Sequence, residues 1–388
     1  MAGRSTGTVK TMALATLLRG FSMSILMTFL PVYAVTIGLS MDEIGTCITL
    51  ATAISTAALP LIGLAVDFIG RKKILILSSV FVASASLTTI AAGSYAGILV
   101  AYTFFHLGIN TWIPARGATL ARDVERGFMG FSFAATTAPF QIARVVTPFV
   151  AGYAILRWGY HSVFLASAAI AAVFAAVVAL GVREYASAKR VDVGYEIAKS
   201  FAPQREEAKL YVFLAIDRFG WRLWLPLLNS YMKAYLGFSE DLIGLLSTLR
   251  GVVSTVSAMP SGMLVDRRGW FAAILASELF AALSPLAILA SNDITGAALA
   301  MASVGLSVSL WTPGFNVAIA SLISDREALG RAYARTTFFR TAAAVPSPWI
   351  GGKLFSVAPQ LPMALSTTIL LLNLAYLAIL KKTLNTQT

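Results

Sequence analysis

The chain has 388 residues, of which 57% are hydrophobic and 12% are charged, and its mean hydropathy is +0.77. Soluble domains carry about 25% charged residues, so the composition excludes a soluble protein and indicates one that crosses a membrane many times. The net charge of +12 does not predict nucleic-acid binding, because in so apolar a chain basic residues flank membrane spans. Two histidines and one cysteine, far apart in sequence, exclude a zinc site, and neither an ATP-binding loop nor a catalytic triad is visible. We expect no metal, no cofactor and no enzymatic activity.

Apolar runs and the breaks between them predict twelve transmembrane helices, and so an all-α membrane protein, because a span needs about 20 residues. The run from Thr11 is too long for a cleaved signal peptide and is followed by further spans. In chain order we expect helices near residues 11–37, 42–66, 74–94, 97–120, 128–156, 161–182, 209–235, 241–265, 270–291, 295–322, 332–357 and 361–381.

Lysine and arginine residues gather on one side of these spans. The opposite connections around residues 41–43, 93–95 and 292–293 contain neither residue type. By the positive-inside rule both termini are cytoplasmic, and we expect a multi-pass protein of the plasma membrane. The basic side carries Arg4, Lys10, Arg71, Lys72, Lys73, Arg122, Arg126, the basic residues of segment 183–209, Arg267, Arg268, Arg326, Arg331, Lys381 and Lys382.

The chain repeats itself at an offset of 199 to 200 positions. A constant offset over several landmarks is what the duplication of a six-helix unit leaves. We therefore expect an N-terminal six-helix bundle over 1–182, a cytoplasmic linker over 183–208 and a C-terminal six-helix bundle over 209–388. The matched landmarks are Gly38-Leu39-Ser40 with Gly237-Phe238-Ser239, Ile44-Gly45 with Ile243-Gly244, Trp112-x-Pro114 with Trp311-x-Pro313, and Pro148-x-x-x-Gly152 with Pro348-x-x-x-Gly352.

A short polar loop between the second and third predicted helices recurs between the eighth and ninth. Its first glycine is expected to let a neighbouring backbone approach, its aspartate can cap a helix or pair with an arginine, and its second glycine permits a positive φ. The first copy reads Gly63-Leu64-Ala65-Val66-Asp67-Phe68-Ile69-Gly70-Arg71-Lys72-Lys73, and the second reads Gly262-Met263-Leu264-Val265-Asp266-Arg267-Arg268-Gly269.

The paired loops resemble the G-x-L-x-D-R-x-G-R-K signature of the major facilitator superfamily, and the resemblance covers essentially the whole chain. It implies a secondary transporter of twelve helices in two pseudo-symmetric six-helix bundles that works by alternating access. We expect a small-molecule substrate, protons or a counter-anion as the coupled species, a lipid bilayer as surroundings, no nucleic-acid partner, and a monomer. The residues expected to act in gating are Gly63, Asp67, Gly70, Arg71, Gly262, Asp266 and Gly269.

Arginines inside the spans are the main candidates for substrate binding, because charged residues are expensive in a bilayer and mark functional sites. Arg19 in the first helix and Arg218 in the seventh hold equivalent positions, and the family resemblance implies that these two helices line a central cavity. A guanidinium suits carboxylate or phosphate, so the pair predicts an anion site. The alternative is a fold-stabilising ion pair, or a side chain that snorkels to the cytoplasmic face. Further substrate-binding candidates are Arg144, Arg222, Trp224 and Arg340.

One stretch carries a second, narrower resemblance. The pattern Arg218-Phe219-Gly220-x-x-x-Trp224-x-Pro226 looks like the seventh helix of organophosphate/phosphate antiporters, whose symmetric arginines in helices one and seven bind phosphate. The resemblance covers one helix and implies a phosphorylated or other organic anion as substrate.

A titratable group within the spans would couple transport to protons, and the candidates are Asp217, Glu278 and His106. Burial disfavours a charged carboxyl whereas a neighbouring arginine favours it, so Glu278 is the better candidate if its surroundings are apolar. The alternative for Glu278 is a salt bridge with Arg250 or another arginine. The alternative for His106 is a packed, hydrogen-bonded residue.

Two transport functions are compatible with these residues. The first is the transport of an organic or phosphorylated anion by central arginines, and the alternative is proton-coupled export of drugs or hydrophobic compounds. Thr147-Pro148-Phe149-Val150-Ala151-Gly152 is a partial version of the antiporter motif Gly-Pro-x-x-Gly-Gly and favours export, whereas the arginines favour an anion. The paired loops and the lack of room for a soluble domain argue against a third function, a non-transporting receptor or scaffold.

Overall fold

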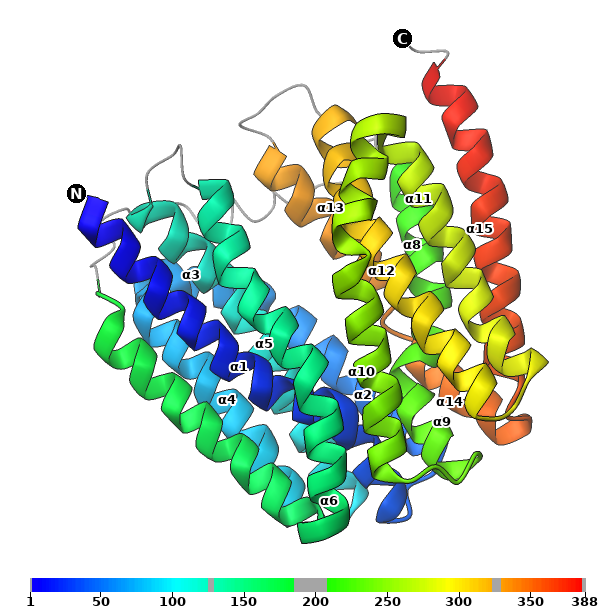
Figure 1. Ribbon diagram of the computed structural model, residues 1–388, viewed down its shortest axis with the longest axis horizontal. Coiled ribbons are helices and arrows are strands. Elements are labelled where there is room, and N and C mark those ends of the chain that lie inside the picture. Colours follow the sequence, from blue (N-terminus) through cyan, green and yellow to red (C-terminus); the bar gives the residue numbers. More distant parts are fainter. Residues whose placement is uncertain (1, 125–128, 185–207, 323–328, 386–388) are drawn as a thin grey trace. The chain divides into compact units, whose positions relative to one another are not determined.

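A computed structural model describes residues 2–124, 129–184, 208–322 and 329–385, and every regular element in these ranges is a helix (Figure 1). The predicted fold class, an all-α membrane protein, is confirmed. The first half contains α1 (Ala2–Thr36), α2 (Met41–Ala57), α3 (Leu59–Phe68), α4 (Arg71–Ala91), α5 (Tyr95–Asp123) and α6 (Met129–Gly181). The second contains α8 (Ala208–Trp224), the 3-10 helix η3 (Leu225–Leu227), α9 (Leu228–Ala234), α10 (Glu240–Val256), α11 (Ala258–Ala290), α12 (Ile294–Leu322), α13 (Leu329–Ala343), α14 (Ser347–Val357) and α15 (Leu361–Asn385).

Four predicted helices are broken, and a proline lies close to each break. The predicted helix 42–66 is the pair α2 and α3, which meet at a bend of 43° just before Pro60. Pro226 lies within η3 and Pro346 is the N-cap of α14, while Pro260 follows the break between α10 and α11. Proline has no N–H to donate, and its ring clashes with the carbonyl four residues earlier. The predictions of continuous helices over 42–66, 209–235, 241–265 and 332–357 are therefore wrong in this respect.

Two long helices contain the turns between successive spans. α6 has 53 residues, about 80 Å at 1.5 Å per residue, whereas a bilayer core is about 30 Å thick. Gly159 within α6 has a φ of 77° and Gly269 within α11 a φ of 79°, a conformation that glycine adopts freely. Seven helices of the described chain are long and apolar enough to cross a membrane, or eight if α2 and α3 form one span. Dividing the two longest ones at these glycines raises the count to ten, and counting α8 with α9 and α13 with α14 as one broken span each gives a number consistent with the predicted twelve.

The chain forms two compact units. Unit 1 comprises residues 1–39, 50–191 and 238–248, and unit 2 comprises residues 40–49, 192–237 and 249–388. Within unit 1, α1 packs on α5 and α6, and α4 packs on both of these helices as well. Within unit 2, α11 packs on α12 and α15, while α8 packs on α13, α14 and α15. The predicted boundaries at 182 and 208 stay a prediction, because residues 185–207 of the proposed linker lie outside the described ranges.

Matched hydrogen bonds show that the six-helix repeat is built twice on one pattern. In unit 1 the Ser78 hydroxyl donates to the carbonyl of Gly108 at 2.8 Å. In unit 2 the Ser277 hydroxyl donates to the carbonyl of Ser307 at 2.9 Å. Each bond joins the helix after a polar loop to the next helix in the chain, and each residue lies 199 positions from its counterpart. Equivalent positions can therefore be compared between the two units.

The glycines among the sequence landmarks mark close contacts between helix backbones. A Cβ atom at each of four such glycines would clash with a carbonyl oxygen of the neighbouring helix. Small residues permit this approach in membrane proteins, so the glycines of the two Pro-x-x-x-Gly motifs allow close helix packing. The pairs are Gly152 with Glu240 and Gly244 with Pro148 in unit 1, and Gly45 with Pro348 and Gly352 with Met41 in unit 2.

The second glycine of each polar loop adopts the positive φ that the sequence predicts. Gly70 has a φ of 106° and is the N-cap of α4, while Gly269 makes the equivalent turn within α11. A Cβ at Gly70 would also clash with the carboxylate of Glu184. The backbone conformation requires glycine at position 70, whereas the exposed Glu184 side chain can move away from an added Cβ.

The first glycine of each loop does not behave as predicted. At Gly63 and Gly262 a Cβ would meet no described atom within 4 Å, so the expectation of a close backbone approach is wrong for the part of the chain that the structure covers. Asp266 is exposed, and the side chain of Asp67 lies outside the described residues. Arg71 is half-buried, and one of its terminal nitrogens has no described partner. The gating roles of these loop residues stay predictions.

Candidate functional site

Arg19 of unit 1 is held between aromatic rings. Only 5% of its surface is exposed, and its guanidinium carbon lies 5.1 Å from the ring centre of Trp112 and 5.7 Å from that of Phe140. Cations are attracted to aromatic faces at such distances. The next residue is Gly20, where a Cβ would come within 2.7 Å of the Ala143 Cβ. Glycine therefore lets α6 approach α1 and brings the Phe140 ring to the guanidinium.

Two more arginines of unit 1 lie near this part of α6. Arg116 on α5 donates from one terminal nitrogen to the Phe133 carbonyl at 3.0 Å and to the hydroxyls of Thr136 and Thr137, both at 2.7 Å, and it is close enough to Arg19 to repel it. Arg144 on α6 donates to the Gln141 side chain at 3.4 Å. No carboxylate in the described part of unit 1 pairs with Arg19, Arg116 or Arg144.

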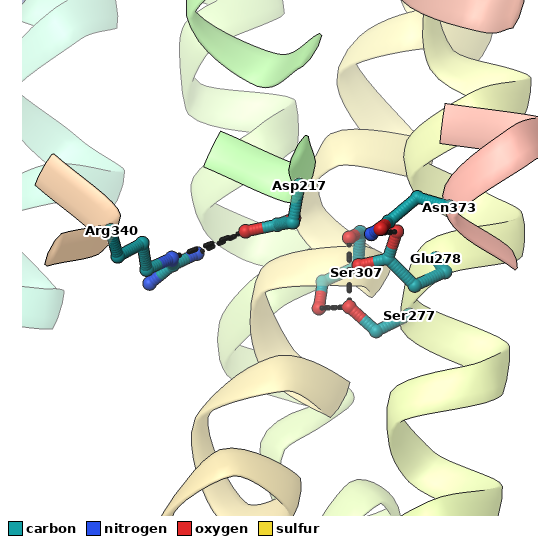
Figure 2. Close-up of polar contacts among 6 residues, drawn as sticks. All are labelled: Asp217, Ser277, Glu278, Ser307, Arg340 and Asn373. Atoms are coloured by element: carbon teal, nitrogen blue, oxygen red, sulfur yellow. Dashed lines mark hydrogen bonds and ion pairs between the residues drawn. The ribbon is translucent and has the colours of Figure 1, made fainter. Parts of the chain in front are cut away.

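Unit 2 contains a buried ion pair at the corresponding place. Asp217 on α8 is fully buried, and its Oδ2 accepts hydrogen bonds from Nε and Nη2 of Arg340 on α13, at 3.1 and 2.7 Å. The Arg340 guanidinium also lies over the Trp311 ring, 4.3 Å from its centre. Figure 2 shows the Asp217 and Arg340 side chains extending toward each other from their two helices. The other oxygen of Asp217 has no partner among the described residues.

Glu278 lies beside this ion pair, on α11. It is fully buried, its Oε2 accepts a hydrogen bond from the Asn373 amide at 3.1 Å, and its Oε1 has no described partner. The Asp217 carboxyl is near enough to repel it. Next to Glu278, Ser277 bonds to Ser307 of α12, which fixes α11 against that helix (Figure 2).

The remaining candidates on α8 differ in how deeply they are buried and in what they contact. Arg218 is half-buried, makes no hydrogen bond or ion pair with described residues, and interacts electrostatically with Arg340, Arg222 and Asp217. Arg222 is 8% exposed, and Trp224 is fully buried with its indole nitrogen unbonded. Unit 2 thus brings together four of the predicted site residues of α8 and α13, and buries Trp224 within the fold.

The third coupling candidate, His106, does not belong to this cluster. His106 lies on α5 of unit 1, half-buried, with its ring edge-on to Phe105 at 5.4 Å between centroids. It belongs to a different unit from Asp217 and Glu278. The alternative of a salt bridge between Glu278 and Arg250 is wrong, because Glu278 accepts from Asn373 and keeps its second oxygen unbonded. The arginine bonded to this acidic pair is Arg340, through Asp217.

Three polar residues of these clusters were not singled out from the sequence. Asn373 interrupts a leucine-rich run, and Arg116 follows Trp112-x-Pro114 within a predicted span. Arg335 on α13 is 4% exposed and donates to the Tyr211 hydroxyl at 2.7 Å. The signal that identifies all three is a polar residue inside an apolar span, which the bilayer makes costly.

The two arginines predicted to share an anion lie in different units, Arg19 in unit 1 and Arg218 in unit 2. Within each unit the arginine has a guanidinium neighbour; Arg19 has an unbonded Nε, and Arg218 is half-buried. The chemistry of each half therefore fits an anion, and the sharing of one ligand stays a prediction.

The comparisons with known proteins agree on one family. The sequence model described as "Major Facilitator Superfamily" matches residues 12–209 and again 210–387. The multi-drug resistance efflux pump PmrA of Streptococcus pneumoniae is 22% identical over 350 residues, 86% of each chain. The multidrug resistance protein MdtG of Yersinia enterocolitica is 24% identical over 65% of this chain and 63% of its own. A bacterial homologue of the human lysosomal transporter Spinster, solved inward-facing and unoccupied, superposes with a TM-score of 0.77 at 13% identity, covering 98% of this chain and 97% of that one.

Proposed function

The chain belongs to the major facilitator superfamily and is a secondary transporter, and we propose that its substrate is an organic or phosphorylated anion with an apolar part. The observation that carries the proposal is Arg19, a buried guanidinium with a free Nε and no carboxylate paired to it in the described residues. An unpaired buried charge is costly, and arginine cannot lose its proton to relieve that cost. An anionic substrate supplies the missing countercharge.

The charges of unit 2 favour the same substrate class. Arg218 interacts electrostatically there with Arg222 and Arg340, and Arg340 is bonded to the carboxylate of Asp217. Close cations repel one another more strongly inside a protein than in water. A bound anion relieves this repulsion, whereas a cationic substrate increases it.

The aromatic neighbours of the arginines favour an apolar part in the substrate. Trp112 and Phe140 face Arg19, and Trp311 faces Arg340. Ligand sites combine such surfaces with a few polar groups that fix orientation. An anion with an aromatic body would use both the rings and the guanidinium groups.

The alternative function is proton-coupled export of drugs or hydrophobic compounds. Two relatives are named as a multi-drug efflux pump and a multidrug resistance protein, and the buried carboxyls Asp217 and Glu278 suit proton binding. An amphipathic anion would fit both functions. A cationic compound would fit only the drug exporter, so ligands of opposite charge separate the two functions.

The experiment compares ligands that share one ring system and differ in charge. Purified protein is heated with naphthoate, naphthyl phosphate or naphthylmethylammonium, because a ligand that binds the folded state raises its midpoint of unfolding. We expect stabilisation by the two anions, and loss of it in the Arg19→Gln, Arg218→Gln double variant. Arg157→Gln is the control, because Arg157 is an exposed arginine that also lies over a ring, that of Tyr153.

Stabilisation by the ammonium compound alone would overturn the anion assignment and support the exporter of cationic or neutral drugs. Wild-type affinity for the anions in a folded double variant would exclude these two arginines as the site. Equal loss in the Arg157→Gln control would point to a general effect of removing charge.

We propose a monomer in the plasma membrane with both termini cytoplasmic, supported by the distribution of lysine and arginine. Cysteines introduced as Ala2→Cys and Gln387→Cys should react with a membrane-impermeant maleimide only after the cells are opened. The native Cys47 is buried, so it gives little background. Labelling of intact cells at either position would contradict this orientation.

A further inference from the structure

Two carboxyl groups of unit 2 are adjacent and incompletely bonded. Asp217 and Glu278 come from different helices, are both fully buried, and lie in one cluster of side chains (Figure 2), where each carboxyl is within electrostatic reach of the other. Each uses one oxygen, Asp217 toward Arg340 and Glu278 toward Asn373. The second oxygen of each has no described partner. Buried polar atoms are rarely left unbonded, so this double exception requires an explanation.

The charges around the two carboxyls indicate that one of them is protonated. If both were ionised, two buried negative charges would face a single bonded guanidinium, that of Arg340. Two carboxylates in one site cannot both ionise without a large repulsion. One hydrogen on either group removes that repulsion and supplies a donor between two oxygens that can otherwise only accept.

We propose that Asp217 and Glu278 hold a single shared proton, and that this pair is the proton-binding site of the transporter. Arg340 then balances the one remaining negative charge, and Asn373 orients Glu278 by donating to its other oxygen. The guanidinium of Arg340 sets how readily the proton leaves, because any movement away from Asp217 strengthens proton binding by the pair.

The other groups around Glu278 do not provide a competing charge partner. α8 brings Arg218 and Arg222 in addition to Asp217, and the electrostatic interactions of Arg218 are with Arg222, Arg340 and Asp217. α13 brings Arg340 and also Arg335, which donates to Tyr211. α12 contains no charged residue, and those of α15 are confined to its last turns, at Lys381 and Lys382. The charged residues of α11 besides Glu278 are Asp266, Arg267 and Arg268, all exposed at the polar loop.

Unit 1 shows what this part of the fold looks like without the pair. At the offset of 199 positions, Leu18 stands for Asp217 and Ser79 for Glu278. The hydrogen bond from Ser78 to α5 is kept, so the helices pack in the same way without an acid. The carboxyl pair is therefore an addition to the repeat and is not required by its packing. This argument does not depend on which solute is carried.

Infrared difference spectroscopy on the purified transporter tests the proposal without any transport assay. Spectra are recorded in H2O and D2O while the pH is raised through neutrality, and the carbonyl stretch of a protonated carboxyl is followed. We expect one such band per chain in the wild type and none in Glu278→Gln. Asp217→Asn should also abolish it near neutral pH, because Glu278 then faces Arg340 without a competing carboxylate and ionises.

Glu43→Gln is the matched control, because Glu43 is an exposed acid that accepts from Ser40 at the start of α2, and it should leave the band intact. The absence of a protonated carboxyl in the wild type overturns the proposal. A band that persists in Asp217→Asn also overturns it, because burial of Glu278 alone would then hold the proton. If an amide variant does not fold, Glu278→Asp and Asp217→Glu replace it, and each should keep the band at a shifted frequency.

Discussion

Units 1 and 2 repeat one helical framework but surround the arginines of their equivalent helices differently. Arg19 and Arg218 are equivalent, as are Trp112 and Trp311, and the serine hydrogen bonds after the polar loops match within 0.1 Å. The surroundings differ at three equivalent positions: Leu18 against Asp217, Ser79 against Glu278, and Phe140 against Arg340 at the offset of 200 that relates Pro148 to Pro348. In unit 1 the charge is covered by aromatic rings, whereas in unit 2 it is part of an ionic network.

This difference suggests that substrate binding and proton binding depend on different residues of the two units. Features that both units keep, an arginine with a tryptophan nearby, are the ones an anionic substrate would contact. Features present in unit 2 alone, the two buried acids with Arg340 and Asn373, are the ones that can bind a proton. Under the two proposals made above, duplication would supply the substrate chemistry twice, and the divergence of one copy would supply the coupling.

The largest expected effect comes from giving unit 2 the residues of unit 1. Asp217→Leu alone leaves Arg340 without its carboxylate and should lower the free energy of unfolding by roughly 2–4 kcal/mol, less than for a fully buried pair because the Arg340 side chain is 18% exposed. The double variant Asp217→Leu, Arg340→Phe should recover stability to within about 1 kcal/mol of the wild type, since a buried ion pair can be replaced by apolar residues. Unfolding in mixed micelles with increasing SDS measures both.

A double variant as unstable as the single one would mean that unit 2 cannot accommodate the apolar residues that unit 1 has at the equivalent positions. The band should vanish in Asp217→Leu, where Glu278 faces Arg340 alone, and return in the double variant, where Glu278 is buried without a cation; recovery of both stability and band would separate the structural role of the ion pair from its effect on proton binding.

The next effect concerns the arginines that both units keep. Each charge-assisted hydrogen bond to an anion contributes about 1.5–3 kcal/mol, and lysine replaces a planar fork by a point charge. Arg19→Lys and Arg218→Lys should therefore each weaken naphthyl phosphate binding by roughly one to two decades. The double variant should lose less than the sum if both side chains hold one ligand. Isothermal titration measures the affinities, with Arg157→Lys as the control.

Strictly additive losses would indicate two independent anion sites, one in each unit. Each unit would then bind an anion by itself, and the prediction of a shared ligand would be wrong.

Sequence reasoning found the repeated framework because that framework depends on local patterns. Apolar runs predicted the spans, and the second loop glycines predicted positive φ at Gly70 and Gly269. It missed the helix breaks, although Pro60, Pro226, Pro260 and Pro346 are visible in the sequence, because it read each apolar run as one straight span. It wrongly expected a close backbone approach at Gly63 and Gly262, where packing depends on a neighbour that the local sequence does not name.

The partners within the candidate site could not be read from the sequence. Asp217 and Glu278 were found because a charged residue in a span is rare, and that argument needs no structure. Their partners Arg340 and Asn373 lie 123 and 95 positions away, so the pairing depends on how four helices are rotated about their axes. The salt bridge between Glu278 and Arg250 shows the limit, because the two charges are complementary but Glu278 bonds to Asn373 in the fold.

Proton coupling should be lost when unit 2 loses its acid and kept when unit 1 is changed at the same place. With one proton moved per substrate, a pH difference of one unit supports about a tenfold concentration ratio. In proteoliposomes loaded with labelled substrate, Glu278→Gln should abolish this ratio while exchange of labelled for unlabelled substrate continues. Ser79→Ala, the change at the equivalent position of unit 1, should leave the ratio intact. A pH-driven ratio that survives in Glu278→Gln would place the coupling group elsewhere, with His106 as the next candidate.

The smallest effect tests whether the two frameworks are equally stable where they look alike. Ser78→Ala removes the bond to Gly108, and Ser277→Ala removes the bonds to the Ser307 carbonyl and hydroxyl, the latter at 3.0 Å. A side-chain hydrogen bond between membrane helices contributes about 0.6 kcal/mol, so each variant should lose about that amount, and Ser277→Ala slightly more because the Ser307 hydroxyl also loses its partner. The SDS unfolding assay resolves such differences when the variants are measured side by side. A loss several times larger for Ser277→Ala alone would show that this serine also holds Glu278 in place, and that the acidic network contributes to the rigidity of unit 2.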